Sequence, residues 1–200
     1  MSAKASAKIR RIVLTGGPGG GKTTAGDLFR REIGRRVVLV PEAATMLFTG
    51  GFPRSHEPEA VKIIQRAVYH MQQELEDLHT VLHPGCLLLC DRGTVDGGAY
   101  WPESGDEFFK MHGTSLKKEL ARYDAVLFFE TAAVGGMSIK GGNPVRDETA
   151  REAIALDQRL RALWSQHPNF VLVPHNPSFF KKISAGLAAL ESLVSHLEES

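Results

Sequence analysis

Residues 16–23 carry the stretch on which the fold depends: Gly16-Gly17-Pro18-Gly19-Gly20-Gly21-Lys22-Thr23. This stretch fits the pattern G-x-x-x-x-G-K-[ST] at every position. Glycines let the backbone wrap closely around a phosphate group and aim successive N–H groups at it. A helix that begins at Lys22 adds the positive end of its dipole. The stretch therefore predicts a loop that binds the phosphates of a nucleoside triphosphate.

The residue types of this loop predict distinct roles. Lys22 is expected to reach the β- and γ-phosphates, and the Thr23 hydroxyl is expected to coordinate Mg²⁺. The expected nucleotide contacts of the loop are Gly17, Pro18, Gly19, Gly20, Gly21, Lys22, Thr23 and Thr24. The alternative is a glycine-rich turn without a ligand. The motif does not specify what happens to the phosphate.

Short apolar runs alternate with helical patterns on both sides of the loop. Runs of this kind predict strands that are covered on both faces. The expected strands are 12–14, 37–40, 87–90, 125–129 and 170–173, and the expected helices are 22–33, 61–82, 116–122, 149–166 and one that follows Ser178. The alternation predicts a three-layer α/β fold with a five-stranded, mainly parallel sheet and right-handed crossovers.

Composition limits the classes of protein to which the chain can belong. Its 200 residues include 24 Lys and Arg against 23 Asp and Glu, a formal charge of +1, and 42% of them are apolar. These values are ordinary for a globular protein and exclude disordered, collagen-like and disulfide-dense chains. A charge near zero also argues against nucleic acid or an anionic membrane as partner, because both need a strong positive field.

The order of residues predicts one domain, 9–200, preceded by a flexible basic tail, 1–8. We find neither a secretory signal nor an apolar stretch of about 18 residues that could span a membrane. Cys86 and Cys90 would lie roughly 13 Å apart in a strand, too far for a disulfide. Two reduced cysteines predict a cytoplasmic location. The sequence does not indicate the oligomeric state.

An acidic residue is expected at the end of a strand beside the loop. Asp91 follows apolar residues 87–90 and fits this place, where its carboxylate would hold Mg²⁺ directly or through water. The next residue is Arg92, whereas hydrolytic motors of the AAA type usually carry a Glu there. A GTPase would need an Asn/Thr-Lys-x-Asp motif, but Lys140 is followed by two glycines. The pattern favours a kinase over a motor or a GTPase switch.

Residues 91–100, Asp-Arg-Gly-Thr-Val-Asp-Gly-Gly-Ala-Tyr, resemble the D-R-Y-x-x-S-x-x-A-Y stretch of thymidylate kinases. They depart from it at Gly93 and Asp96. The nearer resemblance is to a family of small AAA-type, P-loop kinase-like ATP-binding domains that includes the ribosylnicotinamide kinase domain. It rests on the phosphate loop, on residues 91–100, and on segments 40–43, 123–126 and 167–168. The resemblance covers roughly residues 9–197 and implies ATP binding and the strand order 2-3-1-4-5.

Three charged residues are candidates to serve the acceptor of a phosphoryl group. In nucleoside kinases, a Glu at the end of the second strand takes the proton of the substrate hydroxyl, and Glu42 has this place. A Glu that only favours a helix start is the alternative. Asp96 is a rival base, a ligand of a substrate hydroxyl, or a solvated loop acid. Arg92 would contact a phosphate or a substrate carboxylate, or form a salt bridge with Glu42.

Two further segments gain a role from the resemblance. Residues 133–146 contain four glycines and read as a mobile loop, and P-loop kinases have their lid in this connection. Arg146 and Arg151 are the candidates to reach the transferring phosphate. The corner at 174–178 flanks the adenine base in P-loop kinases, so His175 or Asn176 would contact the base. An Asx turn that caps the last helix is the alternative.

These expectations combine into two hypotheses. The first is an ATP- and Mg²⁺-dependent phosphotransferase that acts on a hydroxyl or phosphate of a small molecule, for which a nucleoside-like compound is a candidate. Lys22, Asp91 and the two arginines would stabilise the transferring phosphoryl group. The second is a regulatory or ATPase module whose nucleotide state controls a protein partner.

Overall fold

The computed structural model describes residues 10–34, 36–136 and 149–199. Its sheet has five strands: β1 (Arg10–Thr15), β2 (Val37–Val40), β3 (Leu87–Asp91), β4 (Ala125–Phe129) and β5 (Phe170–Val173). All neighbouring strands pair in parallel, in the order β2-β3-β1-β4-β5. The predicted strand order is therefore confirmed. The predicted tail, 1–8, lies outside the described residues.

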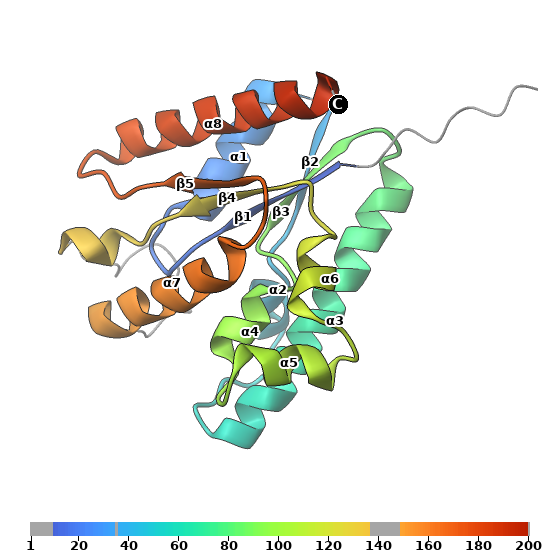
Figure 1. The fold of residues 1–200 in the computed structure, drawn as a ribbon, viewed down its shortest axis with the longest axis vertical. Helices are drawn as coiled ribbons and strands as arrows, with labels where there is room; N and C mark the ends of the chain where they lie inside the picture. Colours follow the sequence, from blue (N-terminus) through green and yellow to red (C-terminus); the bar gives the residue numbers. More distant parts are fainter. Residues whose placement is uncertain (1–9, 35, 137–148, 200) are drawn as a thin grey trace, which may run out of the picture.

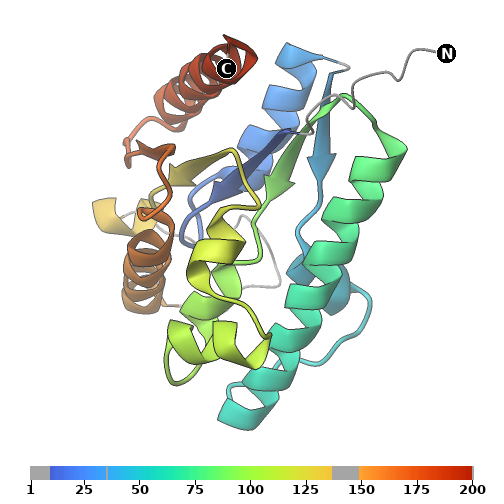
Figure 2. The ribbon, with the colours of Figure 1, turned by 45° about the vertical axis from the view of Figure 1, so that its right-hand side comes forward.

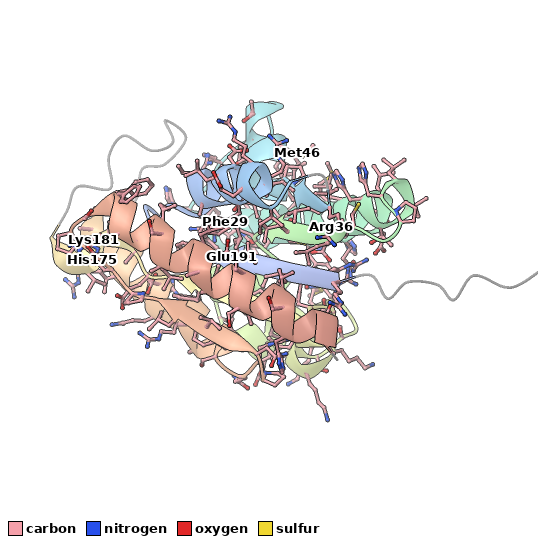
Figure 3. All side chains as sticks on the ribbon, turned by 90° about the horizontal axis from the view of Figure 1, so that it is seen from above. Phe29, Arg36, Met46, His175, Lys181 and Glu191 are labelled. Atoms are coloured by element: carbon pink, nitrogen blue, oxygen red, sulfur yellow. The ribbon has the colours of Figure 1, made fainter. Side chains whose placement is uncertain are left out.

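Helices cover both faces of the sheet, which gives the predicted three layers (Figures 1 and 2). One face carries α1 (Lys22–Ile33) and α8 (Phe179–Glu199). Figure 3 views the molecule from above, with α8 lying along its outside. The other face carries α3 (Pro58–Leu82), α4 (Asp96–Tyr100), α5 (Gly105–Met111), α6 (Leu116–Leu120) and α7 (Ala150–Trp164). Among these described helices, none is long and apolar enough to cross a membrane.

Successive residues of each strand enter different cores. Ile12 and Leu14 of β1 pack with Phe29 of α1 on one face, while Val13 between them packs with Trp164 of α7 on the other. Ile12, Val13 and Leu14 are all fully buried. Because both faces are covered, the strands read as continuous apolar runs rather than alternating ones.

Short elements connect the strands to these helices at the edge where the strands end. The helix α2 (Ala43–Thr49) follows β2, and a single 3₁₀ turn, η1 (Ala132–Gly135), follows β4. Neither α2, α4 nor α5 is predicted from the sequence, because each spans two turns or fewer and shows no helical period. The carboxyl ends of β1, β2 and β3 meet at this edge, which is where ligands bind in open α/β sheets.

A buried lysine of α8 also lies near this edge. Lys182 of α8 is 4% exposed and its Nζ donates a hydrogen bond to the carbonyl oxygen of Glu130, 2.5 Å away. Burial lowers the pKa of the Lys182 ammonium to about 8, although Asp157 and Glu130 attract the charge. The folded state therefore releases a proton that the unfolded state keeps up to about pH 10.5. In this window the unfolded state binds more protons, so this group makes stability rise with pH.

Replacing Lys182 should remove the energetic cost of burying its ammonium group. We expect Lys182→Met to increase the free energy of unfolding by up to ~3 kcal/mol below pH 8, with the gain fading toward pH 10. Chemical denaturation between pH 6 and pH 10 measures it. Lys181→Met changes the exposed neighbour and is the matched control. A gain that does not depend on pH, or one shared by both variants, would contradict the assignment.

Candidate active site

The phosphate-binding loop joins β1 to α1 at the centre of the sheet. Gly16, Gly19 and Gly21 have positive φ angles of 128°, 71° and 88°. A Cβ at Gly16 would lie 2.0 Å from the carbonyl oxygen of Phe129, so a larger residue cannot occupy this position. The loop thus packs closely against the end of β4 and turns into α1 at Gly21, as the motif predicts.

The lysine of the loop lies over the loop itself. Lys22 is 3% exposed, and its Nζ donates a hydrogen bond of 2.8 Å to the carbonyl oxygen of Gly17. An ammonium that donates to a carbonyl oxygen is stabilised further when phosphate oxygens come within reach. Thr23 and Thr24 follow in the first turn of α1, and both are exposed. Their positions are those expected for residues that contact a nucleotide.

Thr23 and Asp91 meet at one point. The Thr23 hydroxyl donates a 2.7 Å hydrogen bond to Oδ2 of Asp91, which ends β3 beside the loop. Asp91 Oδ1 is buried and accepts no hydrogen bond from any described residue. Burial raises the pKa of this carboxyl, and the nearby Glu42 carboxylate raises it further. An unsatisfied carboxylate oxygen beside a hydroxyl suits Mg²⁺, which prefers oxygen ligands and keeps several waters.

The site has no set of three or more His, Cys, Asp or Glu side chains that could hold a metal, as far as the described residues show. Thr23 and Asp91 provide only two oxygen ligands. A magnesium ion held by two protein oxygens needs the remaining ligands from phosphate and water. The donor set therefore fits an ion that arrives with a nucleotide better than a resident metal.

A carboxylate on α7 holds the other side of the loop. Asp157 Oδ1 accepts hydrogen bonds from the backbone N–H groups of Gly17, at 2.8 Å, and of Thr131, at 2.9 Å. The Thr131 hydroxyl donates to the carbonyl oxygen of Pro18. Burial raises the pKa of the Asp157 carboxyl, while the two N–H groups oppose the rise. Asp157 and Thr131 thus fix the first turn of the phosphate loop to α7 and to the end of β4.

Arg92 is the centre of the second half of the site. Its Nε donates to Oε1 of Glu42 at 2.5 Å, and its Nη1 donates to Oδ1 of Asp96 at 3.0 Å. The salt bridge expected as one alternative for Arg92 and Glu42 is therefore present. Among the described residues other than glycine, Arg92 alone has a positive φ, 70°. Backbone strain of this kind persists where surrounding contacts enforce it, as in functional sites.

Asp96 has both carboxylate oxygens occupied. Oδ1 accepts from the Thr15 hydroxyl at 2.7 Å and from Arg92, while Oδ2 accepts from the N–H of Gly93 at 3.0 Å and from Trp164 Nε1 at 3.2 Å. The residue is 5% exposed, so it is not a solvated loop acid. These contacts join β1, β3 and α7. The geometry favours a positioning role for Asp96.

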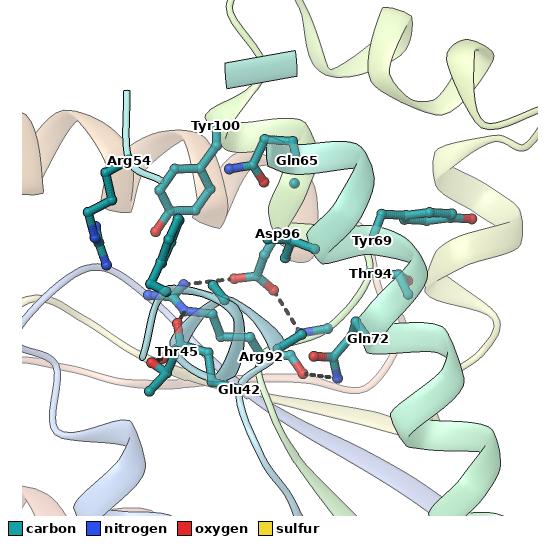
Figure 4. A pocket seen from close by; sticks show the side chains of 16 residues that line it. Glu42, Thr45, Arg54, Gln65, Tyr69, Gln72, Arg92, Thr94, Asp96 and Tyr100 are labelled. Carbon is teal, nitrogen blue, oxygen red and sulfur yellow. Dashed lines mark hydrogen bonds and ion pairs between the residues drawn. The ribbon is translucent and has the colours of Figure 1, made fainter. Parts of the chain in front are cut away.

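Glu42 lies at the start of α2, directly after β2. Its Oε2 accepts a 2.7 Å hydrogen bond from the Thr45 hydroxyl, and its Oε1 is paired with Arg92. Glu42 and Arg92 line one pocket together with Asp96, whereas α2 and α3 form much of the remaining wall (Figure 4). The pocket is lined by Glu42, Ala43, Ala44, Thr45, Phe48, Arg54, Gln65, Val68, Tyr69, Gln72, Arg92, Gly93, Thr94, Asp96, Gly97 and Tyr100.

Gly93 explains one departure from the thymidylate kinase pattern. A Cβ at this position would lie 2.7 Å from the Tyr123 hydroxyl and 2.9 Å from the Trp164 ring. The Tyr123 hydroxyl in turn donates to Glu76 and accepts from the N–H of Thr94. A buried tyrosine and a tryptophan from other elements therefore fill the space beside residue 93, and no side chain fits there.

The remaining predicted residues lie elsewhere. Arg146 lies outside the described residues, as does most of segment 133–146. Arg151 is exposed in the first turn of α7, and no hydrogen bond or ion pair joins it to another described residue. Asn176 Oδ1 accepts from the N–H of Ser178, which is the alternative Asx turn. The His175 ring packs against η1, so close that a Cβ at Gly135 would lie 2.0 Å from its Nε2.

Sequence reasoning did not identify Asp157, Thr131 and Arg54 as site residues. No motif marks them, because Asp157 meets Gly17 across 140 positions of the chain. The glycine at position 17 is the only local signal: a Cβ there would lie 2.6 Å from Asp157 Oδ1. That signal indicates a close approach but not its partner.

Removing the Asp157 carboxylate should loosen the phosphate loop. Asp157→Ala leaves two backbone N–H groups without an acceptor, at a cost of roughly 1–3 kcal/mol each. We expect about tenfold weaker ATP binding and a lower melting temperature, measured by calorimetry and thermal denaturation. Asp157→Asn keeps an oxygen that accepts both bonds and should retain most of the affinity. Equal ATP affinity in the wild type and the alanine variant would contradict the role.

Comparisons with known proteins agree with the fold. A family model described as an AAA domain matches residues 11–179. No curated protein matches the chain. Among solved structures, a deoxyadenosine kinase from M. mycoides with bound dATP is similar, with a TM-score of 0.65, 12% sequence identity, and coverage of 91% of this chain and 99% of that chain. At this identity the likeness shows a shared fold, the P-loop kinase fold with strand order 2-3-1-4-5. Since the family model spans most of its length, the chain belongs to this AAA domain family.

Proposed function

We propose that the protein transfers the γ-phosphoryl group of ATP to a hydroxyl group of a small molecule bound in the pocket beside Glu42, with Mg²⁺ as the metal. One observation carries the proposal: Glu42 lines this pocket and is ion-paired with Arg92, whose neighbour Asp91 bonds Thr23 of the phosphate loop. A carboxylate of the pocket wall is therefore linked through Arg92 to the strand end that contacts the phosphate-binding loop. This is the place where a kinase needs a base.

The donor half of the proposed reaction uses the phosphate loop. Residues 17–24 would surround the phosphates, and Lys22 would exchange the Gly17 carbonyl oxygen for phosphate oxygens. Mg²⁺, when bound, would neutralise charge on the β- and γ-phosphates. Thr23 and Asp91 are the residues that would hold it. Asp157 and Thr131 would keep the first turn of the loop in shape during binding.

The acceptor half uses Glu42. The hydroxyl oxygen of the acceptor attacks the γ-phosphorus, and a new O–P bond forms. The bond from the γ-phosphorus to the β,γ-bridging oxygen breaks, and ADP leaves with the electron pair. Glu42 takes the proton of the hydroxyl, while Arg92 holds its carboxylate in place. Asp96 is the weaker candidate for the base, because four hydrogen bonds already occupy its oxygens.

The chemical class of the acceptor is open between nucleoside-like and other small hydroxyl compounds. The structural neighbour is a deoxyadenosine kinase, which supports testing nucleosides first. Tyr69, Tyr100 and Phe48 line the pocket and provide aromatic surface for a planar ring. A regulatory ATPase module is the competing function, and a pocket adjoining Glu42 favours the kinase.

ADP release tests the proposal directly. We expect Mg·ATP turnover to rise well above its basal rate with a suitable acceptor, and the acceptor to be recovered as its phosphate ester. The panel would contain nucleosides, ribosylnicotinamide and sugars, followed by coupled ADP detection and mass spectrometry. Lys22→Ala should abolish transfer while retaining the fold. A turnover rate that no compound changes, with tight ATP binding, would instead support the regulatory module.

Substitution of the two carboxylates separates their roles. We expect Glu42→Gln to keep ATP affinity nearly intact and to lower turnover by ~10²–10⁴. Asp96→Asn presents an NH₂ group to hydrogen-bond donors, so it should lower the melting temperature as well as turnover. Steady-state kinetics and thermal denaturation distinguish the two patterns. Unchanged turnover in Glu42→Gln would remove Glu42 from the role of base.

A further inference from the structure

The charged side chains of the acceptor pocket are unevenly paired. Four of its lining residues carry a charge: Glu42, Asp96, Arg92 and Arg54. Both carboxylates pair with Arg92. The positive charge of Arg92 is therefore used within the site, and it is not available to neutralise an anionic ligand without a rearrangement.

Arg54 has a different environment. It lies in the connection between α2 and α3, and its guanidinium carbon is 3.9 Å from the centroid of the Phe48 ring. No carboxylate of the described residues lies within ion-pair distance of Arg54, and it is exposed. In Figure 4 its guanidinium points toward the side of the pocket where Thr45 and Glu42 lie. The ring of Phe48 thus holds a cation at the pocket edge through a cation–π contact.

The other walls of the pocket do not compensate this charge. Apart from Arg54 itself and the three charged residues Glu42, Asp96 and Arg92, its lining consists of apolar and neutral polar side chains, including the amides of Gln65 and Gln72. The Gln72 amide is oriented by its Nε2, which donates to Glu76 and to the carbonyl oxygen of Arg92. A guanidinium has a planar set of donors that matches a carboxylate or a phosphate oxygen pair. It is the one lining cation of the pocket without an acidic partner among the described residues.

We propose that the acceptor carries an anionic group in addition to its reacting hydroxyl, and that Arg54 binds this group while the hydroxyl faces Glu42. The inference rests on the proposed function, and it narrows the acceptor to hydroxylated carboxylates or phosphate monoesters. Both anions offer two oxygens to the guanidinium. The anion is a binding group, and the phosphoryl group is transferred to the hydroxyl.

Matched pairs of compounds test this inference. One pair is ribosylnicotinate and ribosylnicotinamide, which differ by a carboxylate, and the other is ribose 5-phosphate and ribose, which differ by a phosphate. Binding is measured by calorimetry with the phosphate loop filled by Mg·ADP, so that an anion does not occupy the loop. Transfer from ATP to the same four compounds is measured separately. Binding and transfer are thus independent readouts.

Three variants complete the design. Arg54→Gln removes the cation, Arg54→Lys keeps a charge without the planar fork, and Arg66→Gln removes an exposed arginine of α3 outside the pocket. We expect the anionic member of at least one pair to bind wild type about 10- to 100-fold more tightly than the neutral member. Arg54→Gln should abolish this preference, and Arg54→Lys should retain part of it. Arg66→Gln should leave it unchanged, and ATP affinity should be the same in all three variants.

The outcomes separate this inference from the proposed function. Equal binding of both members in each pair, no measurable binding of any anionic member, or a preference that survives in Arg54→Gln would overturn it. Transfer to the anionic acceptors at wild-type rates in Arg54→Gln would overturn it while the kinase function stands. Arg54-dependent binding without transfer would support the anion site and remove the kinase function. A loss of ATP affinity in Arg54→Gln would assign Arg54 to the donor and overturn the inference.

Discussion

The Arg92 guanidinium is the contact on which the acceptor side of the site depends. It is buried between the carboxylates of Glu42 and Asp96, which come from the ends of different elements. Burying a guanidinium without partners is costly, and the two carboxylates offset that cost. The pairing therefore holds the start of α2 next to the end of β3. The backbone of Arg92 has a positive φ of 70°, a conformation that persists only where surrounding contacts enforce it.

A single helix connects this half of the site with the phosphate loop. Asp157, in the middle of α7, accepts hydrogen bonds from Gly17 and Thr131, and Trp164, at the end of the same helix, donates to Asp96. One rigid element thus touches both the donor loop and the anchor of the acceptor pocket. Geometry for in-line transfer requires the two halves to be held in a fixed relation. In the proposed transfer, α7 would provide that relation without contributing a reacting group.

The sequence predicts the donor side of the site better than the acceptor side. The phosphate loop, Asp91 and the positions of the strands follow from a contiguous motif and from apolar runs, both of which are local signals. The strand order follows from the family resemblance. Asp157 and Arg54 act through contacts made by folding, and a single sequence does not show which glycine or which pocket they reach. The short helices α2 and α4 show no hydrophobic periodicity, so the pocket wall that they form could not be predicted from the sequence either. The positioning role of Asp96 could be inferred only from its four hydrogen bonds in the folded structure.

The balance of charge explains why this arrangement needs ligands to be complete. Within the described part of the chain, Lys22 and Arg92 are the buried cations near Glu42, Asp91 and Asp96, and burial already disfavours the ionised form of Asp91. In the proposed reaction a triphosphate would add several negative charges to this surplus, and a divalent cation beside Thr23 and Asp91 would offset them. At the pocket edge the balance is reversed, because Arg54 has no acidic partner among the described residues. The same electrostatic rule therefore supports both proposals, a metal in the donor half of the site and an anion at the outer edge of the acceptor half.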